Sequence, residues 1–259
     1  MPDVEKIKEY LNPDMPKIIY YDETDSTNKR AIEYAKLFPE SRESVIFIAK
    51  SQTAGRGRLG RSFFSDGSGL YISFLLYPDA PCEKITKFTP FAAVKLSEAA
   101  EETAGVCPRI KWVNDLYLSG KKLAGILVES QMNSDGKIDY LVCGMGINVY
   151  KTALPEEISD IAVSIEEVTG EKISIEKLAA SLIRKVLSGK DNFDSEEVFS
   201  AYKARLDTVG KEVLVIKPGG SYEAEVLALN PNYSLRLRLG DGSEEDLFTG
   251  EVSLRTKNT

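Results

Sequence analysis

Hydrophobic side chains recur at helical spacing in several segments of the chain. In residues 26–38 the apolar positions share one face, and Ser26 or Thr27 can cap the start of a helix. The segment at 174–189 has the clearest apolar stripe, with polar side chains on its other face. Further helices are predicted at residues 91–105, 156–169 and 194–206.

Short apolar runs rich in β-branched and aromatic residues predict strands between these helices. They lie at residues 44–50, 69–77, 109–118, 122–130 and 138–149. Several of them follow one another with only a turn between, as at "SGK" and "MNSDGK". The pattern therefore predicts an α+β fold, with a mixed, largely antiparallel sheet flanked by helices, and not a doubly wound fold.

The pattern changes after Gly210, where only short strands remain. Turn signals at "PGGS", "NPNY" and "GDGS" separate strand-like segments at residues 211–216, 222–230, 234–240, 244–250 and 251–255. Such a series of short strands predicts a small β-barrel. We therefore expect two domains, residues 1–208 and residues 209–259.

Composition is that of a globular protein, with 42% hydrophobic and 28% charged residues among 259. A net charge of -7 argues against a general nucleic-acid binder, whose surface is basic. The start of the chain shows no signal peptide, and the longest apolar run, residues 70–77, is too short to span a bilayer. With three cysteines that lack metal-ligand spacing, these features predict a cytoplasmic protein with reduced thiols.

The chain contains no histidine, which restricts its possible chemistry. Catalysis by a Ser-His-Asp or Cys-His arrangement is excluded, and so is a histidine-ligated metal. Any reaction must depend on lysine, arginine, carboxylate or amide side chains, or on the reactivity of the substrate itself.

The stretch "SQTAGRGRLGRSFFS", residues 51–65, concentrates cations on a glycine-rich backbone between two predicted strands. Glycine lets backbone N–H groups approach a ligand, and each arginine offers a planar fork of donors that matches phosphate or carboxylate. The order of residues is not that of a P-loop. We favour an anion-binding loop that closes over its ligand; the alternative is a solvated surface hairpin.

Three other stretches carry polar groups that could serve a site. In "KWVNDLYLSGKKLAG", residues 111–125, strand alternation would place Lys111, Val113 and Asp115 on one face. Lys121 is interpreted as an ordinary surface lysine of the turn. For Lys122, an ordinary turn lysine and a lysine with a functional role are equally open interpretations. "GMGINV" at 144–149 could mark the close approach of a ligand or a buried turn, and "TDSTN" at 24–28 could be a helix cap alone.

Taken together, these stretches resemble the biotin protein ligases. "DSTN", "QTAGRGRLGR", "KWVNDLYLSGKKLAGILVES" and "GMGIN" occur in that family's order and spacing, and "FTGEVSLR" at 248–255 is similar to the end of its C-terminal barrel. The resemblance extends from about Tyr20 to the C-terminus. It implies a catalytic domain similar to class II aminoacyl-tRNA synthetases and an SH3-like β-barrel.

The activity implied by the resemblance is an ATP- and Mg²⁺-dependent ligation. Biotin and ATP would form biotinyl-5′-AMP, and biotin would then pass to a lysine of a biotin carboxyl carrier protein. About twenty residues precede "DETDSTN", too few for the DNA-binding domain of some family members, so we expect no DNA partner. A homodimer is possible, for which residues 70–77 could supply an edge strand, although they could equally lie in the core.

The resemblance also implies a role for individual residues. Catalysis is assigned to Lys122, Arg58 and Asp115, and Asp115 is also the candidate Mg²⁺ ligand. Biotin binding is assigned to Ser26, Thr27, Asn28, Gln52, Arg56, Gly57, Arg58 and Lys122. Nucleotide binding is assigned to Arg61, Phe63, Lys111, Asn114, Ile147 and Asn148. The chain departs from the family at Val113, often proline, at Phe63, often tryptophan, and at Met145, often smaller.

Two alternatives remain open. A lipoyl or octanoyl transferase is similar in fold, and its acyl-enzyme branch would need a cysteine such as Cys143, which lies in an apolar run where an inert core thiol is expected. A sensor that binds biotin or nucleotide without turnover is the other alternative. The set of cations around Lys122 argues against the sensor.

Overall fold

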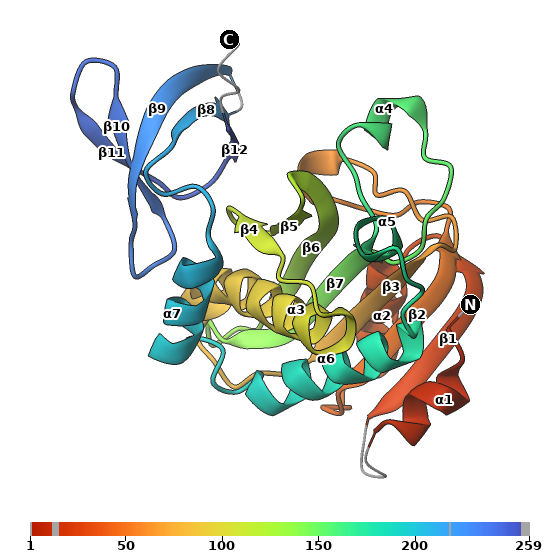
Figure 1. The fold of residues 1–259 in the computed structure, drawn as a ribbon. Coiled ribbons are helices and arrows are strands. Elements are labelled where there is room, and N and C mark those ends of the chain that lie inside the picture. The colour runs from red at the N-terminus through yellow and green to blue at the C-terminus, as the bar shows by residue number, and fades with distance from the viewer. Residues whose placement is uncertain (1, 12–15, 218, 255–259) are drawn as a thin grey trace.

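A seven-stranded mixed sheet forms the centre of the larger part of the molecule (Figure 1). In this computed structural model, which describes residues 2–11, 16–217 and 219–254, the strand order is β1-β2-β3-β7-β6-β5-β4. The first pair is parallel and the others are antiparallel. The strands are β1 (Lys17–Thr24), β2 (Val45–Gln52), β3 (Gly69–Leu76), β4 (Arg109–Lys111), β5 (Asp115–Leu118), β6 (Lys121–Met132) and β7 (Ile138–Asn148).

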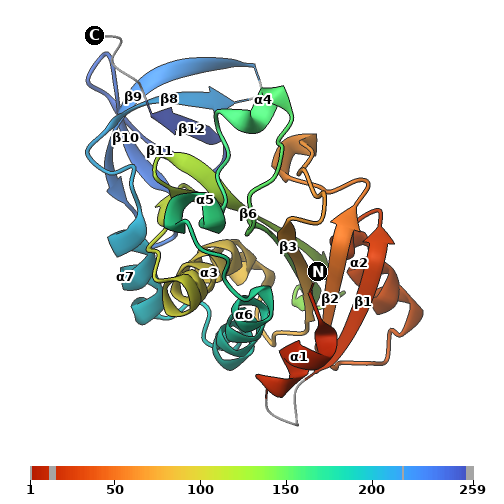
Figure 2. The same cartoon turned by 45° about the vertical axis from the view of Figure 1, so that its right-hand side comes forward.

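Helices cover both faces of this sheet (Figure 2). Alternation along β2 divides its side chains, because Val45 and Phe47 pack with helix α2 whereas Ile46 and Ile48 belong to the larger core. That larger core includes the buried faces of α3 and α6. The helices are α1 (Val4–Glu9), α2 (Thr27–Leu37), α3 (Phe88–Ala104), α4 (Glu156–Ser159), α5 (Ile165–Thr169), α6 (Ile175–Gly189) and α7 (Glu196–Arg205), with 3₁₀ turns η1 (Arg58–Gly60) and η2 (Cys82–Lys87).

The predicted α+β fold class is confirmed, with differences in detail. The helix expected at 156–169 is two short helices, α4 and α5, separated by an irregular segment. Helix α1 and strand β1 had no counterpart among the predicted elements. Residues 70–77 do not form an edge: β3 lies between β2 and β7 and is buried along its whole length, so the core alternative holds.

The strand predicted at 109–118 is wrong, because the chain reverses within it. β4 and β5 pair antiparallel with Lys111 opposite Asp115, and residues 112–114 form the turn between them. Alternation along a single strand therefore does not apply to residues 112–114, which form the turn. Lys111 and Asp115 still share a face as predicted, because they are directly opposed cross-strand partners. The turn is held from two sides, because the Trp112 indole N–H donates to the Tyr233 carbonyl at 2.8 Å and Asn114 Nδ2 donates to the Ile126 carbonyl at 3.0 Å.

A second, smaller sheet follows α7 and is antiparallel throughout (Figure 1). Its order is β11-β10-β9-β8-β12, from β8 (Glu212–Lys217), β9 (Gly220–Leu229), β10 (Leu235–Leu239), β11 (Glu244–Leu247) and β12 (Glu251–Leu254). These are the five strands that the sequence predicts. Residues 255–259, which include the last residue of "FTGEVSLR" and the end of the predicted second domain, lie outside the described residues.

The smaller sheet is attached to the rest of the molecule through Tyr233. Its ring meets the rings of Phe199 and Tyr202 edge-on, with centroids 5.4 and 5.3 Å away, and its carbonyl receives the Trp112 hydrogen bond. The junction thus combines aromatic packing with a buried hydrogen bond. Among the described residues, no helix is long and apolar enough to cross a membrane.

We expect Phe91→Ala to lower the free energy of unfolding by about 3–5 kcal/mol, because it would leave a cavity in the core. The Phe91 side chain is fully buried, and its ring lies 5.1 Å from that of Phe88. Urea denaturation followed by circular dichroism measures the effect. The matched control is Phe248→Ala, since Phe248 is 69% exposed and its loss should cost less than about 0.5 kcal/mol. Equal effects of the two substitutions would contradict the assigned core.

Candidate active site

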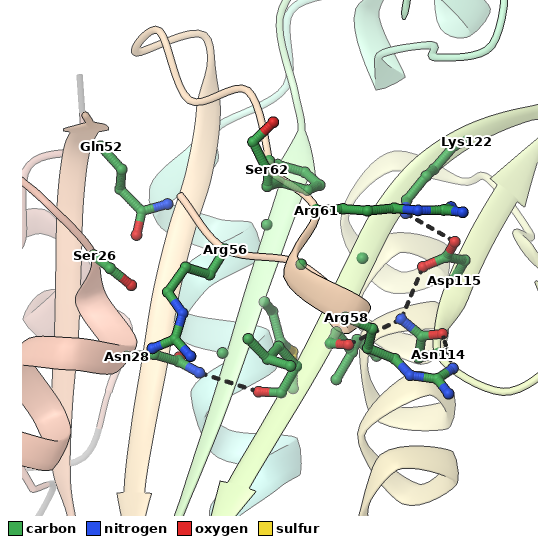
Figure 3. A pocket seen from close by; sticks show the side chains of 18 of the residues that line it. Ser26, Asn28, Gln52, Arg56, Arg58, Arg61, Ser62, Asn114, Asp115 and Lys122 are labelled. Carbon is green, nitrogen blue, oxygen red and sulfur yellow. Dashed lines mark hydrogen bonds and ion pairs between the residues drawn. The ribbon is translucent and has the colours of Figure 1, made fainter. Parts of the chain in front are cut away.

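An open cleft of about 940 Å³ lies between the start of α2, the arginine-rich loop and the ends of the central strands (Figure 3). This volume includes space that is open to solvent. Most of the side chains assigned to a site from the sequence line it: Ser26, Thr27, Asn28, Gln52, Arg56, Gly57, Arg58, Arg61, Phe63, Lys111, Asn114, Asp115 and Lys122. Segments far apart in the sequence therefore meet at one cavity.

One end of the cleft is lined by amide and hydroxyl groups at the start of α2. The backbone N–H and Oγ1 of Thr27 both donate to Gln52 Oε1, at 2.9 and 3.1 Å. Ser73 Oγ lies 2.7 Å from Thr27 Oγ1 and 2.6 Å from Asn28 Oδ1. Thr27, Asn28 and Ser73 are buried, Gln52 is partly buried, and the four side chains orient one another. This end, hereafter the amide end, therefore presents fixed uncharged polar atoms to a ligand.

Ser26 is the N-cap residue of α2, but its hydroxyl makes no capping hydrogen bond. The backbone N–H of Ser26 instead donates to Asp25 Oδ1 at 2.8 Å. Hydrogen bonds from Lys29, and then from Arg30 and the Ser26 N–H, hold the pKa of Asp25 well below its usual range although burial opposes them. Asp25 therefore stays ionised and anchors the helix start, which leaves the Ser26 side chain directed to the cleft (Figure 3).

The arginine-rich loop forms a narrow hairpin above the cleft. Arg56 and Ser62 form an antiparallel bridge, and the Gly57 N–H donates to the Arg61 carbonyl at 2.7 Å. At its base, a Cβ on Gly55 would collide with the Phe63 carbonyl oxygen, so only glycine fits there. The hairpin directs Arg56 toward the amide end and Arg58 toward the opposite end (Figure 3).

The opposite end of the cleft, hereafter the cationic end, contains a chain of hydrogen bonds. Lys122 Nζ lies 2.8 Å from Asp115 Oδ2, and Asn114 Nδ2 donates to Asp115 Oδ1 at 3.0 Å. Arg58 Nη1 completes the chain by donating to Asn114 Oδ1 at 2.9 Å. Of the residues described along the cleft, Asp115 is the single carboxylate, against several arginines and lysines. This excess of positive charge in an acidic protein suits an anionic ligand.

Phe63 covers two glycines on the cleft floor. A Cβ on Gly146 would collide with its ring, and one on Gly125 would lie 3.4 Å from it. The Phe63 ring meets the Tyr71 ring edge-on, with centroids 6.4 Å apart. Burial, and then the nearby charge of Asp66, raise the pKa of Tyr71 to about 12, so its phenol stays neutral. The "GMG" motif is thus neither a turn nor a bulge, because β7 pairs regularly there, and its glycines make room for side chains of this chain.

Two residues assigned to nucleotide binding lie apart from this cleft. Ile147 is fully buried in the core. Asn148 Nδ2 donates to the Val163 carbonyl at 3.2 Å and borders a smaller hollow beside Phe64 and Tyr150. Asn148 Nδ2 also lies 3.4 Å from the Lys122 carbonyl oxygen.

Several cleft or neighbouring residues escaped the sequence analysis. Glu129 is hydrogen-bonded to both Arg56 and Asn28. It follows Gly125 and Leu127 at every second position of β6, and because these two residues line the cleft, this spacing could have indicated that Glu129 lies on the same face. Gly250 reaches the cleft from the smaller sheet. No sequence pattern indicates that contact, because it depends on how the two sheets pack.

Comparisons with known proteins agree with this architecture. Residues 20–148 match the model of the biotin/lipoate A/B protein ligase family. The bifunctional ligase/repressor BirA of Bacillus subtilis is 41% identical over 159 residues, which cover 60% of this chain and 48% of that protein. The BirA of Salmonella typhimurium is 30% identical over 236 residues, 90% of this chain and 72% of that protein.

A solved structure extends the match to nearly the whole chain. The biotin protein ligase of Aquifex aeolicus, in complex with biotin and ATP, superposes with a TM-score of 0.74 at 29% identity, covering 92% of this chain and 98% of that one. The chain spans about half the length of the B. subtilis relative. The resemblance found in four sequence motifs is confirmed, and the chain belongs to the biotin/lipoate A/B protein ligase family.

Proposed function

We propose that this protein joins biotin to a carrier protein in two steps, through biotinyl-5′-AMP. The observation that carries the proposal is the division of one cleft into an amide end and a cationic end. The first suits the uncharged, hydrogen-bonding ring system of biotin, and the second suits its carboxylate and the phosphates of ATP. The Aquifex relative, which binds biotin and ATP, supports the same assignment.

In the first step, a carboxylate oxygen of biotin attacks the α-phosphorus of ATP. A new P–O bond forms, the bond to the bridging oxygen of the β-phosphate breaks, and pyrophosphate leaves. A carboxylate is already nucleophilic, so the step needs no general base and suits a chain without histidine. The main obstacle is repulsion between two anions, which Lys122 and Arg58 reduce while they hold the reactants in line.

In the second step, the amine of a carrier lysine attacks the carboxyl carbon of the mixed anhydride, and AMP leaves. The amine must lose a proton to become nucleophilic. Asp115 is the carboxylate at this end of the cleft, and its oxygens are oriented by Lys122 and Asn114. We assign to Asp115 the task of steering the amine and accepting that proton.

Mg²⁺ would enter with the triphosphate. Among the described residues no group of three or more metal-ligating side chains occurs, and Asp115 is the carboxylate among those that line the cleft. One carboxylate with phosphate and water oxygens is a common environment for this ion. The residues present therefore fit a nucleotide-borne Mg²⁺, for which Asp115 would supply a ligand and which would neutralise phosphate charge.

The alternative functions fit the structure less well. An acyl-cysteine mechanism would require an accessible thiolate, but Cys143 is fully buried and burial raises the pKa of its thiol. A sensor without turnover would not need the ordered hydrogen-bond chain from Lys122 to Arg58. The partner we propose is the carrier protein or domain of a biotin-dependent carboxylase.

The decisive experiment supplies the purified protein with ATP, Mg²⁺, a biotin carboxyl carrier domain and biotin, and measures the carrier mass. We expect addition of one biotinyl group together with release of pyrophosphate and AMP. Lipoate replaces biotin in a parallel reaction and should leave the carrier unmodified. Modification by lipoate alone, or biotin binding without pyrophosphate release, would exclude the proposal in favour of one of its alternatives.

Lys122→Ala should lower the rate of biotinyl-AMP formation at least about 100-fold, because a fixed cation is lost where charge develops. Pyrophosphate release measures the rate, and circular dichroism checks that the fold persists. The matched control is Lys121→Ala: this adjacent lysine does not line the cleft, and its Nζ donates to the Ser159 carbonyl at 3.3 Å. Similar losses in both variants would show that the position of Lys122 is not special.

Residues 51–65 should exchange backbone hydrogens more slowly when biotinyl-AMP is bound, because the arginine-rich hairpin would close on the anion. Hydrogen–deuterium exchange with mass spectrometry measures the protection. The turn at residues 133–137, between β6 and β7, serves as an internal control whose exchange should not change. Equal exchange of residues 51–65 with and without ligand would rule out closure.

A further inference from the structure

Glu129, on β6, binds two elements that meet at the amide end. Its Oε2 accepts from Asn28 Nδ2 at 2.8 Å, and its Oε1 accepts from Arg56 Nη2 at 2.9 Å. Asn28 belongs to α2, whereas Arg56 lies in the arginine-rich hairpin. One carboxylate therefore joins the helix start to the arginine-rich hairpin.

The contact with Asn28 fixes the orientation of a buried amide. Asn28 is only 4% exposed, and Ser73 Oγ lies 2.6 Å from its Oδ1. The nitrogen is directed to Glu129 and, at 3.3 Å, to the Leu127 carbonyl. A carboxylate can only accept, so Glu129 specifies which side of the amide faces it.

The contact with Arg56 holds a guanidinium that already lines the cleft. The side chain of Arg56 is 51% exposed and that of Glu129 is 24% exposed. Without a partner, an arginine on a glycine-rich hairpin would sample many rotamers and would have to be ordered again when a ligand binds. Figure 3 shows Arg56 beside Asn28. Glu129 is hydrogen-bonded to both side chains.

We propose that Glu129 is a positioning residue, which pre-orders Arg56 and Asn28 for the binding of biotin. The inference rests on the proposed function, since it names biotin as the ligand of the amide end. Glu129 does not line the cleft, so it acts through its two partners and touches no reacting atom. Its loss should weaken biotin binding selectively, because ATP is assigned to the cationic end.

Glu129→Gln tests this assignment with little change in shape. The glutamine carbonyl can still accept from Asn28, but the charge that holds Arg56 is lost. We expect the KM for biotin to rise about three- to ten-fold, with kcat and the KM for ATP nearly unchanged. The matched control is Glu102→Gln, at a glutamate that pairs with Arg184 and Lys185 away from the cleft, which should leave both KM values unchanged. Equal rises in both KM values, or no rise, would overturn the proposal.

A double-mutant cycle separates positioning from a general structural effect. In an Arg56→Ala background, Glu129→Gln should raise the biotin KM by less than about two-fold, because its partner is already absent. Fully additive effects would show that Glu129 does not act through Arg56.

Hydrogen exchange in the ligand-free protein tests the same idea without turnover. Glu129→Gln should accelerate exchange at the amides of Gly57 and Phe63, which close the hairpin, and Glu102→Gln should not. Unchanged exchange would overturn the positioning role even if the wild-type protein proves active. Accelerated exchange in a protein that forms no biotinyl-AMP would instead retain the role of Glu129 in ordering Arg56 and refute biotin as the ligand.

Discussion

The hydrogen-bond chain from Lys122 through Asp115 and Asn114 to Arg58 organises the cleft. It joins the central sheet, the turn between β4 and β5 and the arginine-rich hairpin. A lone cation here would be mobile, and several would repel one another. Because Asp115 pairs with Lys122 and is linked through Asn114 to Arg58, the two cations stay ordered and still leave a net positive charge for an anion.

Glycines in the central strands leave space for side chains at the other surfaces of the cleft. Gly144 gives room to the Asn28 side chain, and Gly146 and Gly125 give room to the Phe63 ring. The strands can therefore carry large polar and aromatic groups above them without a bulge. Fixed polar atoms, an aromatic ring and cations thus line one groove.

Much of this arrangement was accessible from the sequence. Alternating and helical periodicity identified most strands and helices, and motif spacing brought together the residues around Lys122. The hairpin at 109–118 was missed although Asn114 and Asp115 are typical turn residues, because the apolar and aromatic residues on both sides of them suit a strand. The turn is also held by a hydrogen bond from Trp112 to the distant Tyr233. Gly250 was missed because its place at the cleft depends on how the two sheets pack, which local propensity does not encode. The spacing along β6 could have indicated the face on which Glu129 lies, but not its partners Asn28 and Arg56.

The place of Trp112 has a spectroscopic consequence. It is the only tryptophan of the chain, its indole lies against the cleft, and its N–H is bound at the junction with the smaller sheet. This one tryptophan is therefore in contact with both the cleft and the junction between the two sheets. Its emission wavelength would respond to water leaving the groove and to any loosening between the two sheets, so ligand entry and separation of the sheets could be followed optically without a label.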